Sequence, residues 1–316
     1  MIHLIVKPGE VIQWDEFCET HPAYSIALDG YVRGAPRFQD AKEGGPRQNF
    51  NHHEDVDRLG TRCTAAQVHY AIKNGLFECF DEQGIPKANL YVNDPDQDVS
   101  LAVWLLRNHE RIRGERSEPL INMLVNLADR LDVTGGCYPM DPNDRALRQY
   151  DWVFEPYTAA RMAGRLPQLS PKEVEGVIEA VGRRIDEYTL GKGKELPVDT
   201  RYEIIGGGQD WKLVKETGSR ARLKMMKDGI HAFASVLNQR ADGKWTYTLA
   251  RQSVYIPFPV DGLYDYLNAL EGMTSPSGWG GGNTIGGSPR KFGSSLDPAK
   301  LERAINEYIA EQHAHA

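Results

Sequence analysis

The chain has 316 residues, of which 41% are hydrophobic, 26% charged and 9% aromatic, which is typical of a soluble globular protein with room for two domains. No apolar run is long enough to span a membrane and no secretory signal pattern opens the chain, so we expect a cytoplasmic protein without membrane contact. A net charge of −7 argues against a protein that coats long nucleic acid, whereas a small phosphorylated substrate needs only a local cluster of cations.

Short apolar runs alternate with helical patterns in the first half of the chain. Buried strands are predicted at 3–7, 24–30 and 88–94, and helices at 64–75, 99–112 and 118–132. In the first helix, Thr64 is the expected N-cap, Gln67 its capping-box partner and Gly75 the stop signal. Such alternation predicts an α/β domain with a largely parallel sheet, whose ligand crevice lies beyond the carboxyl ends of the strands.

A helix at 169–188 has clear start signals, because Ser170 is suited to be the N-cap and Glu173 to close a capping box. The polar segment 189–200 follows, and there we expect the boundary between an N-terminal domain (1–190) and a smaller α/β domain (200–316). Within the second domain, strands are predicted at 230–239, 244–256 and 292–296, and helices at 261–272 and 297–312 with Asp297 as cap. The four scattered cysteines predict free buried thiols in a reducing compartment.

Three polar clusters are candidates for chemistry, and the first is "NDPDQD" at 93–98. It contains Asp94, Asp96 and Asp98, but a calcium loop would need Gly and Glu where Val99 and Leu105 stand. One aspartate would suffice to cap the helix that follows. Three carboxylates repel one another unless a cation neutralises them, so both metal binding and helix capping remain open interpretations.

The second cluster is the pair His52 and His53, which follows a third strand end. Neutral imidazole is a common ligand for manganese, iron or zinc, and neighbouring carboxylates favour a harder ion such as Mn²⁺. A solvated polar turn is the alternative. Because Asp29 closes another predicted strand, the sequence predicts that these side chains meet at one edge of the sheet.

The third cluster is the glycine-rich "GWGGGNTIGGSPR" at 278–290. Its glycines allow backbone amides to approach an anion, and Arg290 adds a cationic donor. The spacing of a lysine-containing phosphate loop is not present, and a plain surface loop is the alternative interpretation.

Together these clusters resemble the DHH phosphoesterase superfamily, whose members hydrolyse phosphoesters and phosphoanhydrides. "NHH" (51–53) is similar to the Asp-His-His signature, "PDQD" (95–98) to the Pro-Asp-x-Asp element, and the glycine stretch to the substrate loop of the associated C-terminal domain. Three features depart from the family pattern: Asn51 stands where the signature has aspartate, the Asp-x-Asp element follows the histidines instead of preceding them, and Val92 stands where a histidine usually precedes the Pro-Asp-x-Asp element, so that Asp94 would have to compensate. The changed order indicates a permuted or divergent branch.

The resemblance implies a two-domain, metal-dependent phosphoesterase with two ions, Mn²⁺ or Mg²⁺. By that resemblance the expected metal ligands are Asp29, His52, Asp96, Asp98 and Asp132, with Asp129 competing for the last place. His53 and Arg290 are the expected phosphate-contacting catalytic residues, and Gly280, Gly281, Gly282 and Asn283, with Arg290, the substrate-binding ones. The expected substrate is a small phosphorylated molecule or a short oligonucleotide. A catalytically inactive nucleotide-binding or phosphate-binding protein on the same scaffold is the alternative, and the sequence allows a homodimer.

Overall fold

The computed structural model describes residues 1–274, 277–289 and 291–315, and it forms two compact α/β units. The first unit comprises Met1–Val56, Gly60–Val133 and Asn143–Val198. The second comprises Asp57–Leu59, Thr134–Pro142 and Asp199–Ala316. The main change of unit therefore falls within the polar segment 189–200. The two short excursions of the chain into the second unit were not predicted.

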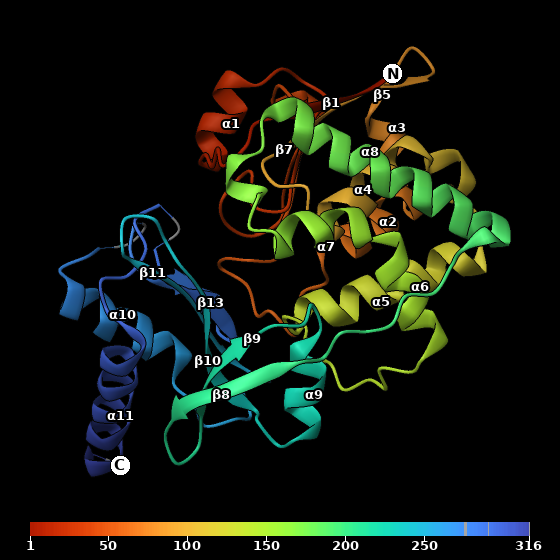
Figure 1. Ribbon diagram of the computed structural model, residues 1–316. Helices are drawn as coiled ribbons and strands as arrows, with labels where there is room; N and C mark the ends of the chain where they lie inside the picture. The colour runs from red at the N-terminus through yellow and green to blue at the C-terminus, as the bar shows by residue number, and fades with distance from the viewer. Residues whose placement is uncertain (275–276, 290, 316) are drawn as a thin grey trace. The chain divides into compact units, whose positions relative to one another are not determined.

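The first unit is built on a five-stranded sheet in the order β1-β7-β2-β4-β3. Strands β1 and β7 of this sheet are labelled in Figure 1. Its strands are β1 (Ile2–Val6), β2 (Ser25–Leu28), β3 (Arg37–Gln39), β4 (Arg47–Phe50) and β7 (Ala88–Val92). All neighbours pair in parallel except β3, which is an antiparallel edge strand. Because β7, β2 and β4 are adjacent and parallel, their carboxyl ends lie at one edge, and the predicted polar residues follow directly from them.

Eight helices of the described chain belong to this unit: α1 (Trp14–Thr20), α2 (Thr64–Lys73), α3 (Leu76–Cys79), α4 (Gln97–Arg107), α5 (Pro119–Val133), α6 (Arg145–Val153), α7 (Glu155–Met162) and α8 (Pro171–Glu187). A two-residue hairpin, β5 (Asp81–Glu82) and β6 (Ile85–Pro86), precedes β7. Helix α4 contacts α2, α5 and α8 and is buried from Asp98 to Leu106. A fully buried helix must be apolar on every side, which explains the run "VSLAVWLL".

The second unit has a six-stranded sheet in the order β12-β13-β11-β10-β9-β8. Its strands are β8 (Tyr202–Gly207), β9 (Lys212–Glu216), β10 (Ala232–Gln239), β11 (Trp245–Arg251), β12 (Gly280–Gly281) and β13 (Ile285–Gly287), and its helices are α9 (Ala221–Lys227), α10 (Val260–Glu271) and α11 (Pro298–His315). Only β9 and β10 pair in parallel. Alternate residues of β10 enter two core clusters: Ala234 packs in the cluster of α10 and α11, and Phe233 in the cluster of α9.

Several local predictions are confirmed and others are wrong. Ser170 and Glu173 form the expected capping box, and Asp297 accepts a hydrogen bond from the backbone of Lys300 at 2.9 Å. Residues 292–296 do not form a strand; Ser294 makes only an isolated bridge to Trp245. A strand there would need a longer run of paired backbone; instead, Glu271 accepts hydrogen bonds from Ser294 and Ser295, and the Tyr247 hydroxyl donates to the Leu296 carbonyl.

The four cysteines are free, as predicted, but only Cys63 and Cys137 are buried. Cys79 is exposed and Cys18 is partly exposed, so the prediction of buried thiols is wrong for these two. Within the described part of the chain, none of the helices combines the length and hydrophobicity that crossing a bilayer requires.

Candidate metal site

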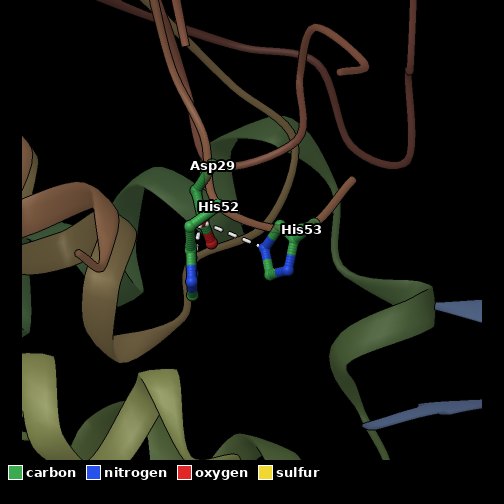
Figure 2. A group of neighbouring side chains, drawn as sticks. All are labelled: Asp29, His52 and His53. Atoms are coloured by element: carbon green, nitrogen blue, oxygen red, sulfur yellow. Dashed lines mark ion pairs between the residues drawn. The ribbon is translucent and has the colours of Figure 1, made fainter. Parts of the chain in front are cut away.

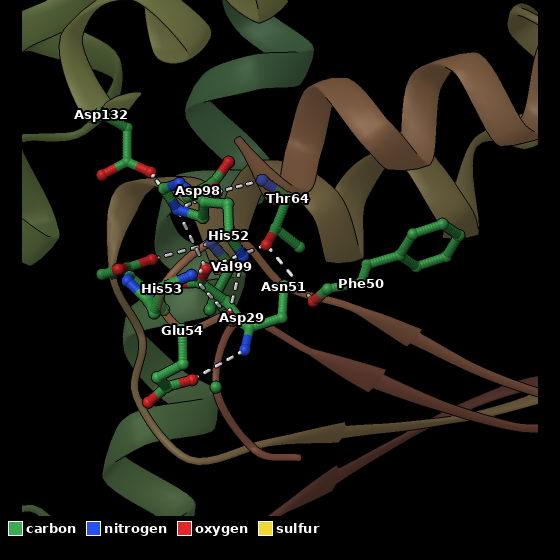
Figure 3. Close-up of polar contacts among 12 residues, drawn as sticks. Asp29, Phe50, Asn51, His52, His53, Glu54, Thr64, Asp98, Val99 and Asp132 are labelled. Carbon is green, nitrogen blue, oxygen red and sulfur yellow. Dashed lines mark hydrogen bonds and ion pairs between the residues drawn. The ribbon is translucent and has the colours of Figure 1, made fainter. Parts of the chain in front are cut away.

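Four side chains from four segments of the first unit converge beyond the carboxyl ends of β2 and β4 (Figure 3). Figure 2 shows two of them, Asp29 and His52, together with His53. The His52 Nε2 atom lies 2.7 Å from Asp132 Oδ2, 3.4 Å from Asp29 Oδ1 and 3.7 Å from Asp98 Oδ2. Asp29 follows β2, His52 follows β4, Asp98 is in the first turn of α4 and Asp132 is in the last turn of α5. The sheet edge therefore gathers residues that lie far apart in the sequence.

Two overlapping groups of three residues have geometry compatible with a metal ion. One is Asp29, His52 and His53, and the other is His52, Asp98 and Asp132; within each group the ligand atoms all lie within 4.8 Å of one another. His52 is completely buried, whereas the side chains of His53 and Asp132 are 29% and 30% exposed. The cluster is thus enclosed on one side and reaches solvent on the other, as a site that admits a substrate requires.

The surroundings of the two His52 ring nitrogens indicate whether these residues suit a metal ion. Both of its nitrogens are buried and neither makes a hydrogen bond of acceptable geometry, although a carboxylate oxygen lies 2.7 Å from Nε2. A buried ring nitrogen without a directional hydrogen bond is costly. Imidazole nitrogen with several carboxylate oxygens is also a donor set that divalent ions bind. The cluster of Asp29, His52, Asp98 and Asp132 can therefore hold a metal ion.

The carboxylates and the His52 ring lie close enough together to shift one another's pKa values. Burial, together with the charges of Asp132 and Asp29, raises the pKa of Asp98 well above its usual value. For Asp29, burial acts in the same direction, but the charge of His53 and the close approach of the His52 and His53 rings outweigh it and hold the pKa well below its usual value. Burial alone would lower the pKa of His52, yet Asp132 and Asp29 raise it to about 10. The site accumulates negative charge that favours a cation.

Asp98 also anchors the start of α2. Its Oδ2 accepts a hydrogen bond from the Thr64 amide at 2.6 Å and its Oδ1 from the Ala65 amide at 2.8 Å. These amides are at the positive end of the helix, which stabilises a carboxylate. The Thr64 hydroxyl in turn donates to Asp29 Oδ1 at 2.9 Å. Thr64 is therefore the first residue of α2 and a support for Asp29, not the predicted N-cap.

The predicted capping-box partner Gln67 has a different role as well. Its Nε2 donates to the backbone carbonyls of Asn51, at 2.9 Å, and Arg62, at 2.7 Å. The helix start is capped from other elements, so no local capping box is needed. Instead, Gln67 fastens the segment that carries the two histidines.

Asp132 and Asp129, which the sequence left as competitors, take separate places. Asp132 lies in the cluster. Asp129, one helical turn earlier, accepts hydrogen bonds from the Cys63 amide at 2.8 Å and from Arg62 Nη1 at 2.9 Å. Its oxygens are occupied by the start of α2, and it belongs to neither metal group of the described residues.

Asp96 was predicted as a ligand, but it belongs to neither group. It is the N-cap of α4, and its Oδ1 accepts from the Val99 amide at 2.8 Å. Burial and the charges of Asp29 and Asp94 raise its pKa well above the usual value, so it lies within electrostatic reach of the cluster. Of the two aspartates in "DQD", the structure therefore gives the ligand geometry to Asp98 and the capping geometry to Asp96.

A neighbouring side chain that sequence reasoning missed is Tyr157 of α7. Burial and the charges of Asp94 and Asp96 raise the pKa of its hydroxyl. The start of α7 is near that of α4, because Gln97 Nε2 contacts Thr158 Oγ1 at 3.5 Å. No motif marks Tyr157, and α7 itself was not predicted.

The predicted glycine loop is a β-hairpin formed by β12 and β13. A Cβ atom on Gly286 would lie 2.1 Å from the Tyr264 hydroxyl, whereas one on Gly280 would meet nothing within 4 Å. The Tyr264 hydroxyl donates to the Gly282 carbonyl at 3.1 Å. At the turn, Arg251 Nε donates to the Asn283 carbonyl at 2.9 Å, which sequence reasoning missed. Close packing thus explains why residue 286 is glycine. The predicted phosphate-binding residue Arg290 lies outside the described residues.

No family model, curated protein or solved structure matches this chain. The similarity to the DHH phosphoesterases therefore rests on the motifs and stays a prediction.

Proposed function

We propose that the protein is a metal-dependent phosphoesterase that acts on a small phosphorylated or short nucleotide-type substrate. The observation that carries the proposal is the convergence of Asp29, Asp98 and Asp132 on the buried His52 nitrogen. Manganese or magnesium, as two ions, is the proposed cofactor, because carboxylates outnumber imidazoles in the site. A divalent ion bound there would supply Lewis-acid activation of water and stabilisation of negative charge on the phosphate.

The chain's own residues would divide the work as follows. Asp29, His52, Asp98 and Asp132 hold the ions, and the helix start that Asp98 caps keeps that carboxylate in place. His53 is on the partly exposed side, with Nε2 3.1 Å from Asp29 Oδ1. That contact orients the ring, and we assign its other nitrogen to the substrate phosphate. From the sequence resemblance alone, we assign substrate contacts also to Gly280, Gly281, Gly282, Asn283 and Arg290.

The test compares two aspartates on the same helix. Hydrolysis of bis(p-nitrophenyl) phosphate is measured with Mn²⁺, with Mg²⁺ and after chelation, for the parent, Asp132→Asn and Asp129→Asn. Asp132→Asn should lose at least about tenfold in turnover, since even partners outside the ligand shell contribute that much. Asp129→Asn keeps an oxygen for the Cys63 amide and should stay within about twofold, because a surface ion pair contributes only about 0–1 kcal/mol.

Metal content of the three purified proteins is measured in parallel. Metal-independent hydrolysis, or equal losses in the two variants, would overturn the proposal. Retained metal without hydrolysis of any phosphoester would favour the inactive phosphate-binding protein instead.

A further inference from the structure

Directly after the candidate ligand Asp132, the chain passes from the first unit into the second. Asp132 is in the last turn of α5, which ends at Val133, and Thr134–Pro142 belongs to the second unit. The last carbonyls of a helix have no partner within the helix, and helix ends fray unless the following residues are held. The position of the Asp132 carboxylate therefore depends on what fixes the residues just after it.

Those residues are fixed by an arginine. Arg222 Nη1 donates to the Gly135 carbonyl at 2.6 Å, and Nη2 donates to Glu216 Oε1 at 3.0 Å. The guanidinium carbon also lies 5.4 Å from the centre of the Phe233 ring. The Arg222 side chain is only 18% exposed, so solvent screens these contacts weakly.

Two glycines follow the end of α5, and one of them packs against β13. Gly135 and Gly136 have φ angles of 58° and 81°, the left-handed region that glycine tolerates. A Cβ on Gly135 would lie 2.7 Å from Ile285 Cδ1, so the chain passes directly against β13. Cys137 then enters the core cluster that includes Phe233.

We propose that Arg222 is a positioning residue for the metal site: by holding the Gly135 carbonyl it keeps the last turn of α5 formed and Asp132 in ligand geometry. The inference rests on the metal site of the proposed function, but not on hydrolysis. A cation close to a helix C-terminus also opposes the negative end of the helix dipole. Lysine cannot replace this role, because one ammonium group does not reach both Glu216 and the Gly135 carbonyl as a planar fork does.

The first unit offers a matched control in Arg184. Its Nη1 donates to the Trp152 carbonyl at 2.6 Å and its Nη2 to Glu155 Oε2 at 2.7 Å, and the guanidinium lies 5.0 Å from the Trp152 ring centre. Trp152 is in the last turn of α6, which carries none of the candidate ligands. Arg184→Lys therefore removes the same kinds of contact at another helix end.

The experiment measures Mn²⁺ affinity by titration calorimetry and amide hydrogen exchange of the metal-free protein, for the parent, R222K and R184K. R222K should raise the Mn²⁺ dissociation constant about 10–100-fold and speed exchange at residues 129–135, because partners outside the ligand shell have effects of that size. R184K should change neither the amide exchange at residues 129–135 nor the Mn²⁺ dissociation constant. If R222K does not fold, Ile285→Ala, which removes the side chain beside Gly135, takes its place with the same expectations.

An unchanged Mn²⁺ affinity in R222K, with or without faster exchange, overturns the positioning role. An equal loss of affinity in R184K also overturns it, because the effect would then be general. A parent that binds Mn²⁺ but hydrolyses nothing refutes the proposed function alone, and a parent that binds no Mn²⁺ refutes both.

Discussion

Asn51 occupies the position where the resembled signature has aspartate, and its contacts explain the amide. Its Oδ1 accepts hydrogen bonds from the His52 amide at 2.8 Å and the His53 amide at 3.2 Å. Its Nδ2 donates to the Gly34 carbonyl at 2.8 Å and to Glu54 Oε2 at 3.0 Å. Asn51 is fully buried and sets the backbone of both histidines. Only a side chain with both an acceptor and a donor satisfies all four partners.

This predicts that Asn51→Asp does not improve the site. A carboxylate would place an oxygen against two acceptors, the Gly34 carbonyl and Glu54, and lose the hydrogen bonds that Nδ2 donates. We expect the free energy of unfolding at neutral pH to fall by about 1–3 kcal/mol, the cost of leaving a buried polar group unsatisfied. Urea denaturation of the metal-free protein measures it. A variant as stable as the parent, with higher metal-dependent turnover, would show that the amide is a catalytic defect instead.

Among the secondary-structure elements, the start of α2 and the β12–β13 hairpin both depend on contacts with distant parts of the chain. The first amides of α2 are capped by Asp98 and Asp129, which come from α4 and α5, so the helix start fixes a candidate ligand. In the hairpin, neighbouring atoms leave no room for a side chain at Gly281, Gly286 and Gly287, whereas Gly280 has open space. In both, a local pattern in the sequence is explained by a non-local contact.

Two glycines of the hairpin should therefore respond differently to alanine. Gly286→Ala places a methyl group against the Tyr264 hydroxyl and within 2.4 Å of the Gly280 carbonyl oxygen, and overpacking of this kind costs about 1–3 kcal/mol. Gly280→Ala meets nothing within 4 Å and should leave the melting temperature unchanged. Calorimetry tests both variants. If Gly280 contacts substrate as proposed, Gly280→Ala raises KM at unchanged stability; a large loss of stability in Gly280→Ala would contradict the packing explanation.

For the whole molecule, the two units differ in what a metal ion can stabilise. The ligand candidates all belong to the first unit, whose core is the parallel sheet with its helices. A metal that binds the folded unit and not the unfolded chain stabilises that unit by mass action. The second unit carries none of the clustered ligands found among the described residues.

Mn²⁺ should accordingly raise the melting temperature of the first unit alone, which scanning calorimetry measures. At a metal concentration of about a hundred times the dissociation constant, the gain is about 2.7 kcal/mol. For a unit of this size that corresponds to about 5–11 °C in melting temperature, at about 2–4 °C per kcal/mol. Asp132→Asn should abolish the shift and Asp129→Asn should keep it. A shift of equal size in Asp132→Asn would mean that the metal binds elsewhere.

Much of the fold could be predicted, because local patterns carried enough information. The strands that become β1, β2 and β7 are continuous apolar runs, and α8 has both of its capping signals. Helices α6 and α7 and strands β8 and β9 were missed. The short elements α1, α3, α9 and β3 were missed as well. Strand β8 has no buried residue, so its hydrophobic pattern is weak, whereas α6 is amphipathic and could have been found from its periodicity.

The sequence by itself determined the α/β class, the elements with strong patterns and the polar residues that follow three strand ends: Asp29, the His52–His53 pair and the aspartates at 94–98. Only the tertiary structure decided which carboxylates meet: Asp132 rather than Asp129, and Asp98 with Asp96 as a helix cap. It also showed that Asn51 accepts hydrogen bonds from the amides of both histidines and that Arg222 donates to the Gly135 carbonyl, two residues after α5. The physical reason is that caps and strands depend on neighbours in the chain, whereas ligand geometry depends on the order and register of strands and helices that bring distant residues within a few ångströms.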